Sequence, residues 1–244
     1  MKVVIIVQAR MNSQRLPGKV LKPVMGKPLL AYLIERLQRV KKAEQVLVAT
    51  TINQQDDEIV DFCETNKISV FRGSESDVLE RYYEVAKEVH ADVVVRVTAD
   101  CPLIDPDLID EAIKTFLDKS PEYKYLSNTQ VRTYPRGMDI EVFSFEKLEE
   151  AYKRAVQKVE REHVTIYIYK NLSRSELGQV QKEDNQSHHR WTVDTQEDFE
   201  LVKSILEHIV PENPHFTLDD LLLAFKNNPQ WFHINSSIHQ KVIC

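Results

Sequence analysis

The stretch K-V-V-I-I-V, residues 2–7, runs directly into Q-A-R-M-N-S-Q-R-L-P-G-K, residues 8–19. The β-branched residues predict a buried strand, and the polar residues after them predict a loop at its carboxyl end. In an open α/β sheet, ligands bind at that edge. Arg10, Arg15 and Lys19 bring positive charge to this loop, which makes it the first candidate for a ligand site.

Apolar runs alternate with amphipathic stretches along the first half of the chain, a pattern typical of repeated strand and helix units. Strands are predicted at residues 2–7, 45–50, 69–71, 93–97 and 123–126. Helices are predicted at residues 29–37, 57–63, 77–90 and 107–117. The predicted fold class is therefore α/β, with a mostly parallel sheet flanked by helices.

From Tyr134 the pattern changes, and we interpret residues 134–178 as a small lobe inserted over the sheet. This lobe is predicted to contain a strand at 139–143, a helix at 145–155 and a charged helical stretch at 160–170. Its strand is a candidate edge for a homodimer.

The chain then returns with W-T-V-D, residues 191–194, which predicts a last strand ending at Asp194. Thr195 and Asp198 have the spacing of a helix cap, and that helix should reach about Ile209. Residues 211–244 form a C-terminal segment with a helix from about Thr217 and a poorly patterned tail.

Composition limits the class of protein. The chain has 244 residues, of which 42% are hydrophobic, so residues 1–244 can form one domain with a sizeable core. The net charge of −6 argues against a general nucleic-acid binder, because binding the phosphate backbone requires a basic face. The sequence has no signal-peptide pattern and no apolar run near the ~20 residues that span a membrane, so we expect a cytoplasmic protein without a membrane partner.

The cysteines give no sign of a disulfide or a metal site. Cys63, Cys101 and Cys244 are odd in number and widely spaced, which fits neither a disulfide framework nor zinc ligands. We expect reduced thiols.

The loop from Ala9 to Lys19 is a candidate phosphate site. The sequence contains no G-x-x-x-x-G-K-[ST] motif, and no G-x-G-x-x-G follows a strand, so a different phosphate cradle is needed. Arg10, Arg15 and Lys19 can meet anionic oxygens, and Asn12 and Ser13 add donors. The alternative interpretation is a solvated basic loop with a Pro-Gly turn.

Two aspartates follow predicted strands and are candidate ligands of Mg²⁺. Asp100 ends the strand of V-V-V-R-V-T-A-D, and Asp194 ends W-T-V-D. Because parallel strands align their carboxyl ends, both carboxylates can reach one edge, and Mg²⁺ takes one or two carboxylates plus phosphate oxygens. Alternatively, each aspartate caps the helix that follows it.

Other polar groups are less specific. The turn that contains Gly73 and Asp77 could contact a base through its backbone, or be an ordinary connection between strand and helix. Asp139 and Glu141 alternate with apolar residues and should face one side of a strand, where they could bind sugar hydroxyls, help bind a metal or form a solvated edge. Cationic hydrogen-bond donors for an acidic substrate are offered by R-E-H-V-T at 161–165 and by H-H-R at 188–190. The simpler interpretation is that these residues lie in solvated helices and loops.

These motifs together resemble the cytidylyltransferases that make CMP-activated sugar acids, such as the acylneuraminate and 3-deoxy-manno-octulosonate enzymes. Residues 8–21 are similar to the family's amino-terminal signature I/V-x-A-R-x-x-S-x-R-L-P-G-K. The similarity is closest to the branch of spore coat polysaccharide biosynthesis protein F, through R-G-S-E-S-D-V-L-E-R-Y, R-V-T-A-D-C-P-L-I-D, G-M-D-I-E-V-F-S-F, R-E-H-V-T and T-V-D-T-Q-E-D-F, in this order.

The resemblance implies a fold like that of nucleotide-diphosphate-sugar transferases, also called glycosyltransferase-A-like, and a set of site residues. Arg10, Lys19 and Asp100 would be catalytic, and Asp100 and Asp194 would bind Mg²⁺. The nucleotide would contact Ala9, Arg10, Asn12, Ser13, Arg15, Lys19, Gly73, Ser74, Asp77 and Thr98. The residue patterns described above, instead of the resemblance, predict that the acceptor contacts Asp139, Glu141, Arg161 and His163.

The implied activity is transfer of CMP from CTP to a small sugar acid with release of pyrophosphate, in surface or spore coat polysaccharide biosynthesis. We also expect a homodimer, on the ground of the strand in the inserted lobe. Two alternatives stay open. One is a glycosyltransferase that uses a preformed nucleotide sugar, and the other is a nucleotide-binding protein without turnover.

Overall fold

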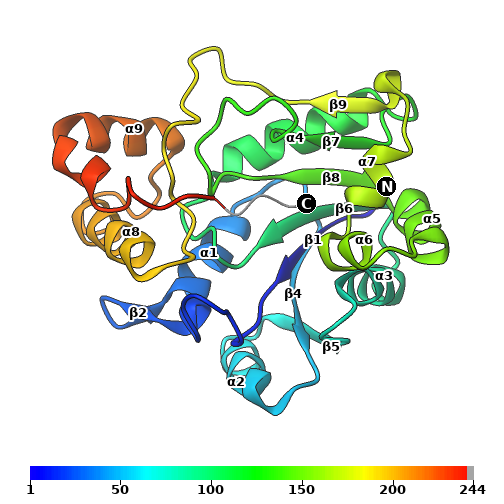
Figure 1. Cartoon of the computed structure of the whole chain (residues 1–244), viewed down its shortest axis with the longest axis horizontal. Coiled ribbons are helices and arrows are strands. Elements are labelled where there is room, and N and C mark those ends of the chain that lie inside the picture. Colours follow the sequence, from blue (N-terminus) through cyan, green and yellow to red (C-terminus); the bar gives the residue numbers. More distant parts are fainter. Residues whose placement is uncertain (241–244) are drawn as a thin grey trace.

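The computed structural model describes residues 1–240 and arranges seven strands of these residues in one sheet, in the order β5-β4-β1-β6-β8-β7-β9 (Figure 1). The strands are β1 (Val3–Gln8), β4 (Gln45–Thr51), β5 (Ser69–Gly73), β6 (Val93–Thr98), β7 (Tyr125–Ser127), β8 (Glu141–Ser144) and β9 (Leu177–Gln179). β5, β4, β1 and β6 pair in parallel, β8 is antiparallel to both of its neighbours, and β9 is parallel to β7. The predicted α/β class with a mostly parallel sheet is confirmed. β2 (Pro23–Val24) and β3 (Lys27–Pro28) form a separate short ladder.

Helices flank this sheet. They are α1 (Leu29–Leu37), α2 (Asp57–Thr65), α3 (Val78–Glu88), α4 (Pro106–Asp118), α5 (Phe145–Arg154), α6 (Lys158–His163), α7 (Ile166–Lys170), α8 (Gln196–Ile209) and α9 (Leu218–Asn227). The predicted cap of α8 is confirmed, because the Thr195 and Asp198 side chains each accept a bond from the other's backbone N–H. Among residues 1–240, no helix is both long enough and apolar enough to cross a membrane.

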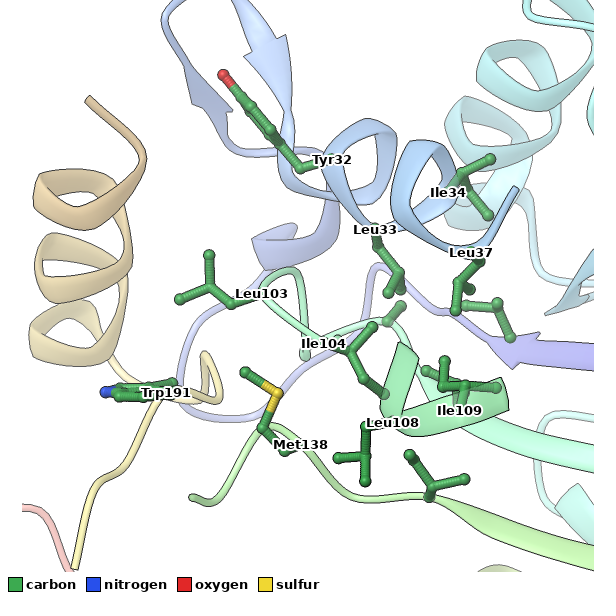
Figure 2. Packing of buried hydrophobic residues seen from close by; sticks show 14 of the residues in the cluster. Tyr32, Leu33, Ile34, Leu37, Leu103, Ile104, Leu108, Ile109, Met138 and Trp191 are labelled. Atoms are coloured by element: carbon green, nitrogen blue, oxygen red, sulfur yellow. The ribbon is translucent and has the colours of Figure 1, made fainter. Parts of the chain in front are cut away.

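The core has two parts, one on each face of the sheet. Alternate residues of β1 point to opposite faces, so Ile5 packs in one cluster with α1 and α4, while Ile6 packs in the other with α3 and α5. Figure 2 shows Leu33 and Leu37 of α1 pointing toward Ile104 and Ile109 in the first cluster. Burial on both faces explains why the central strands are almost continuously apolar.

The strand order places a crevice beside the end of β1. The chain moves from β1 to β4 and β5 on one side, and β6 adds on the other side, with Gln8 in register with Thr98. Ligands bind at such a switch point, outside the carboxyl ends of the strands. The loop after β1 and the loop that contains Asp100 therefore meet at this edge.

Residues 134–178, which we interpreted as a lobe over the sheet, contribute β8 and β9 to the sheet itself. β8 pairs with β6 on one side and β7 on the other, so the expectation that it offers a free edge for a homodimer is wrong. The strand also starts later than predicted, at Glu141. The reason is local, because the N–H of Ile140 bonds to the Asn128 side chain at 3.0 Å instead of to a neighbouring strand.

The charged stretch at 160–170 is two helices instead of one. Val164 separates α6 from α7 with φ of 60°, and the Thr165 N–H bonds to the His163 carbonyl at 2.6 Å. This tight turn is strained for a β-branched residue, and such conformations are rare outside sites that the surrounding structure holds in place. It brings the His163 and Thr165 side chains to the same pocket.

The segment 191–194 is extended but is not a regular strand. Its N–H groups bond to two separate loops: Trp191 N to Arg136 O at 2.7 Å, and Val193 N to Asp100 O at 2.8 Å. Gly137 lets its loop pack directly against the backbone of segment 191–194, because a Cβ at this position would lie 2.7 Å from the backbone N of Thr192. The prediction of a strand was wrong, but its expected position beside Asp100 was right.

Candidate active site

The loop after β1 is held in place by an aspartate that sequence reasoning missed. The buried Asp56 accepts the Met11 N–H at 2.6 Å and also the Thr51 hydroxyl. The loop closes on itself where the Gly18 N–H bonds to Met11 O at 2.8 Å, with Gly18 in the left-handed conformation. Lys19 then begins a short helix and points its side chain back toward the sheet edge.

Lys19 joins the two predicted metal ligands. Its Nζ donates to Asp100 Oδ2 at 2.8 Å, to Asp194 Oδ1 at 2.9 Å and to the Val193 carbonyl at 2.7 Å. The other Asp194 oxygen accepts from Arg15 at 2.8 Å and from Arg190 at 3.0 Å. Residues far apart in the sequence thus form one cluster of charge.

The cluster changes the acidity of its members. Burial alone would lower the pKa of Lys19, but Asp100 and Asp194 outweigh it and raise that pKa. Burial alone would raise the pKa of Asp100, but the ion pair with Lys19 outweighs it and lowers that pKa. At neutral pH the lysine is therefore charged, and Asp100 is ionised.

The cluster lies in a pocket of about 270 Å³, the first pocket, which brings together most of the predicted nucleotide and metal residues. Its lining includes the predicted Ala9, Arg10, Ser13, Arg15, Lys19, Thr98, Asp100 and Asp194, together with Gln8, Gln14, Val20, Arg81, Ala99 and Glu162. Arg81 and Glu162 lie in the quoted motifs R-G-S-E-S-D-V-L-E-R-Y and R-E-H-V-T, but neither was predicted to belong to the nucleotide site.

Four predicted nucleotide residues do not line this pocket. Asn12 lies near Glu75, a half-buried residue, and together with Asn53 it lowers the pKa of the Glu75 carboxyl. Gly73, Ser74 and Asp77 form the turn before α3, where the Ser74 carbonyl accepts from Arg81 and Asp77 caps the helix by accepting the Glu80 N–H at 2.9 Å. Their contact with a base stays a prediction, and the observed role of this turn is to hold Arg81.

A second pocket of about 710 Å³ lies next to the first, and Thr98 lines both. It contains three of the four predicted acceptor residues, Asp139, Glu141 and His163. The fourth, Arg161, lies elsewhere and pairs with Asp77 through its Nε at 2.8 Å. The lining is completed by Arg96, Tyr125, Thr129, Gln130, Arg132, Arg136, Thr165, Ile166, Tyr169 and Gln240.

The carboxylates of this second pocket are already paired. Glu141 accepts from Arg96, from the Tyr125 hydroxyl at 2.6 Å and from the Thr165 hydroxyl at 2.5 Å. Asp139 accepts two bonds from Arg132, at 2.5 and 2.8 Å. Because both carboxylates are paired with arginines, the charge that remains unpaired on the pocket wall is positive.

Arg136 supplies that remaining positive charge. Within residues 1–240, no carboxylate lies within salt-bridge distance of its guanidinium, which faces the second pocket beside Arg132. Burial, and then the nearby charge of Arg132, lower the pKa of Arg136. A guanidinium with like-charged neighbours and no carboxylate partner favours an anion.

The histidine pair at 188–189 lies away from both pockets. His189 packs against Trp191 and Phe225, with ring centroids 5.0 and 4.9 Å away. Burial, together with His188, lowers the pKa of His189 to about 4, so it is neutral and is not a cation for an acidic substrate. Arg190, by contrast, reaches the site and bonds Asp194.

The carboxylates of Asp100 and Asp194 fit the chemistry of Mg²⁺. Both point at the same lysine nitrogen, so their oxygens converge, and hard oxygen ligands are what this ion prefers. Within residues 1–240, no group of three or more metal-ligating side chains occurs. An ion held here would therefore need further oxygens from a bound phosphate or from water.

Comparisons with known proteins agree with this geometry. Residues 4–222 match the family model described as cytidylyltransferase. The chain is 32% identical over 234 residues to spore coat polysaccharide biosynthesis protein SpsF of Bacillus subtilis, covering 93% of this chain and 95% of that protein.

Two solved structures are similar as well. A cytidylyltransferase from Leptospira borgpetersenii superimposes with a TM-score of 0.92 at 38% identity, covering 98% of this chain and 100% of that one. A CMP:2-keto-3-deoxy-manno-octonic acid synthetase complexed with CTP has a TM-score of 0.64 at 20% identity, covering 85% and 99% of the two chains, and shares the fold.

Proposed function

This chain belongs to the cytidylyltransferase family, and from that premise we propose that it transfers CMP from CTP to a sugar acid and releases pyrophosphate. The observation that carries the proposal is the convergence of Lys19, Asp100 and Asp194 in a pocket beside the end of β1. The first pocket is then the nucleotide pocket, and the second is the acceptor pocket. The names of the relatives support a role in surface or spore coat polysaccharide biosynthesis.

The nucleotide pocket suits a triphosphate. Arg10, Arg15 and Lys19 come from one loop, and Arg81 adds a guanidinium from α3. Guanidinium groups bind phosphate oxygens with two parallel bonds, and an ammonium adds a point charge. In this proposal, Lys19 and Arg15 bind phosphate oxygens and at the same time keep Asp194 in position.

Asp100 and Asp194 are the residues that would hold Mg²⁺. When bound, the ion would neutralise charge on the phosphates and complete its coordination with their oxygens. Thr98 orients one of these carboxylates, because its hydroxyl donates to Asp100 Oδ1 at 2.6 Å.

The two adjacent pockets suit in-line transfer of the CMP group. A hydroxyl oxygen of the acceptor forms a bond to the α-phosphorus, the bond from that phosphorus to the bridging oxygen breaks, and pyrophosphate leaves, while the hydroxyl proton passes to solvent. Such chemistry depends mainly on position and on neutralising charge. Thr98, shared by both pockets, marks where the two substrates would meet.

The acidic nature of the acceptor is supported by Arg136. Among residues 1–240, the Arg136 guanidinium has no carboxylate at salt-bridge distance, and a carboxylate on the acceptor could accept two of its bonds. The paired carboxylates Asp139 and Glu141 keep oxygens that can accept bonds from sugar hydroxyls.

A pyrophosphate-release screen tests this function. Four nucleoside triphosphates are combined with several 2-keto-3-deoxy sugar acids and with neutral sugars, in the presence of Mg²⁺. The proposal expects release only with CTP and a sugar acid. Formation of a glycoside from a CMP-sugar without pyrophosphate would instead support a glycosyltransferase, and CTP binding without any release would support a nucleotide-binding protein without turnover.

A further inference from the structure

The C-terminal tail, residues 228–240, lies beyond the part of the chain that matches the family model. In Figure 1 it is the red segment that leaves α9 and runs back toward the sheet. Its last described residue, Gln240, lines the acceptor pocket. The tail therefore reaches the site from a part of the sequence in which no functional pattern was visible.

The position of the tail is fixed by buried contacts. Trp231 is only 7% exposed and packs edge-on against Phe225, with ring centroids 5.4 Å apart. Asn235 is 5% exposed, and its Nδ2 donates to the Arg190 carbonyl at 3.0 Å and to Asp198 Oδ1 at 2.8 Å. These contacts hold the tail against α8, α9 and the segment around Arg190.

Gln240 is oriented by an arginine of the site. Its Oε1 accepts from Arg190 Nη1 at 2.5 Å. Its amide nitrogen has no hydrogen-bond partner within residues 1–240. An amide that is held by its oxygen and lines a pocket has two N–H donors left for a ligand.

Arg136 lines the same pocket as this amide. The backbones of Arg136 and Arg190 form an isolated bridge, and both Arg136 and Gln240 line the acceptor pocket. One wall of the pocket therefore offers a guanidinium without a carboxylate partner and a neutral donor. A carboxylate, with four lone pairs on two oxygens, can accept from both.

We propose that Gln240 is a specificity residue of the acceptor site and that its amide nitrogen donates a hydrogen bond to the anionic group that Arg136 binds. This inference rests on the proposed function and assigns part of acceptor recognition to the tail. The acceptor then has its acidic group at the tail side of the pocket and its reacting hydroxyl toward Thr98.

The contribution of Gln240 can be separated from nucleotide binding. Arg190 also donates to both oxygens of Asp198, at 2.9 and 2.8 Å, so it stays in place when Gln240 is changed. Asp194 in turn keeps its bonds from Lys19 and Arg15. A change at Gln240 should therefore affect the acceptor and leave CTP binding unaltered.

The test compares Gln240→Ala and Gln240→Glu with Ser237→Ala, an exposed tail residue that lines neither pocket. Steady-state pyrophosphate release is measured with 3-deoxy-manno-octulosonate and with N-acetylneuraminate at saturating CTP, and the KM for CTP is measured separately. Loss of one hydrogen bond to a charged group predicts an acceptor KM about tenfold higher in Gln240→Ala. Gln240→Glu should raise it further by repulsion, while Ser237→Ala and the KM for CTP stay at wild-type values.

Equilibrium binding of the same two sugar acids, measured by calorimetry, gives a second readout that does not need turnover. If the wild-type protein releases no pyrophosphate, the proposed function fails, and weaker sugar-acid binding by Gln240→Ala than by Ser237→Ala still supports the role of the tail. If the acceptor KM and the binding constant of Gln240→Ala equal those of Ser237→Ala, or if neither sugar acid binds, the role of the tail is overturned.

Discussion

Lys19 Nζ lies 2.8 Å from Asp100 Oδ2, although 81 residues separate the two in the sequence. The contact joins the loop after β1 to the loop after β6, two neighbouring parallel strands whose ends are in register. Asp194 completes the cluster from the segment before α8. The cations and carboxylates of the proposed triphosphate site thus come together through the topology of the sheet.

Asp100→Asn should lower pyrophosphate release by about 10²-fold or more, because it removes one preorganised charge at the reacting phosphates. The fold should persist, since Lys19 keeps Asp194 and the Val193 carbonyl as partners. Asp118→Asn, which changes an exposed pair with Lys114 on α4, is the matched control and should leave turnover unchanged. Near-normal turnover in Asp100→Asn would count against the assignment.

Arg136→Ala should raise the KM for a sugar acid by about ten- to a hundredfold, the usual effect of losing a charge-assisted hydrogen bond. The KM for CTP should stay the same, because Arg136 lines only the second pocket. Steady-state kinetics with each substrate varied in turn provide the measurement. Equal increases in both KM values would show that Arg136 does not distinguish the acceptor.

Asp77→Ala should destabilise the protein by about 1 kcal/mol, because it removes the cap of α3. The same change leaves the mostly buried Arg161 guanidinium without its carboxylate, which adds to this loss. Urea unfolding measures the free energy, and the KM for CTP measures any role at the base. A large rise in that KM with unchanged stability would restore Asp77 to the nucleotide site.

His189→Phe should remove part of the acid sensitivity of the protein. The ordinary pKa of this histidine is 6.5, and burial lowers it to about 4 in the folded chain. Below pH 6.5 this histidine is therefore protonated in the unfolded chain but still neutral in the folded chain. The stability of the fold falls until the pH reaches about 4, where the histidine is protonated in both states.

The loss over this window should be on the order of 3 kcal/mol, given about 1.4 kcal/mol for each pKa unit. Urea unfolding at pH 7 and pH 4.5 gives the two free energies. The difference should shrink in His189→Phe and persist in the control His215→Gln, which changes an exposed histidine that does not contribute to the lowered pKa of His189. Equal differences in wild type and His189→Phe would show that another group carries the effect.

Much of the fold could be predicted from local pattern. β1, β4 and β6 are continuous β-branched or apolar runs, and α8 carries its cap in the sequence, so their positions follow from periodicity and capping. β8 was misplaced relative to the sheet, because nothing in its own residues says that it pairs with β6. The segment at 191–194 looked like a strand, but two loops satisfy its backbone.

The site could be predicted where residues stand at strand ends. Asp100 and the loop around Lys19 follow buried strands directly, and parallel pairing brings such ends together. Arg96 was missed, although a charged residue within V-V-V-R-V signals a buried partner, which is Glu141. Arg136 and Gln240 carry no local signal, because their place in the acceptor pocket depends on contacts with Arg190, far along the chain.

The most direct measurement of the central claim is ³¹P NMR of the protein incubated with CTP, Mg²⁺ and a 2-keto-3-deoxy sugar acid. Our account predicts that the three phosphate resonances of CTP disappear while pyrophosphate and one phosphodiester resonance appear in equal amounts. Asp100→Asn should leave the CTP resonances in place. An unchanged CTP spectrum with every sugar acid that binds, or release of CMP without a phosphodiester, would contradict the account.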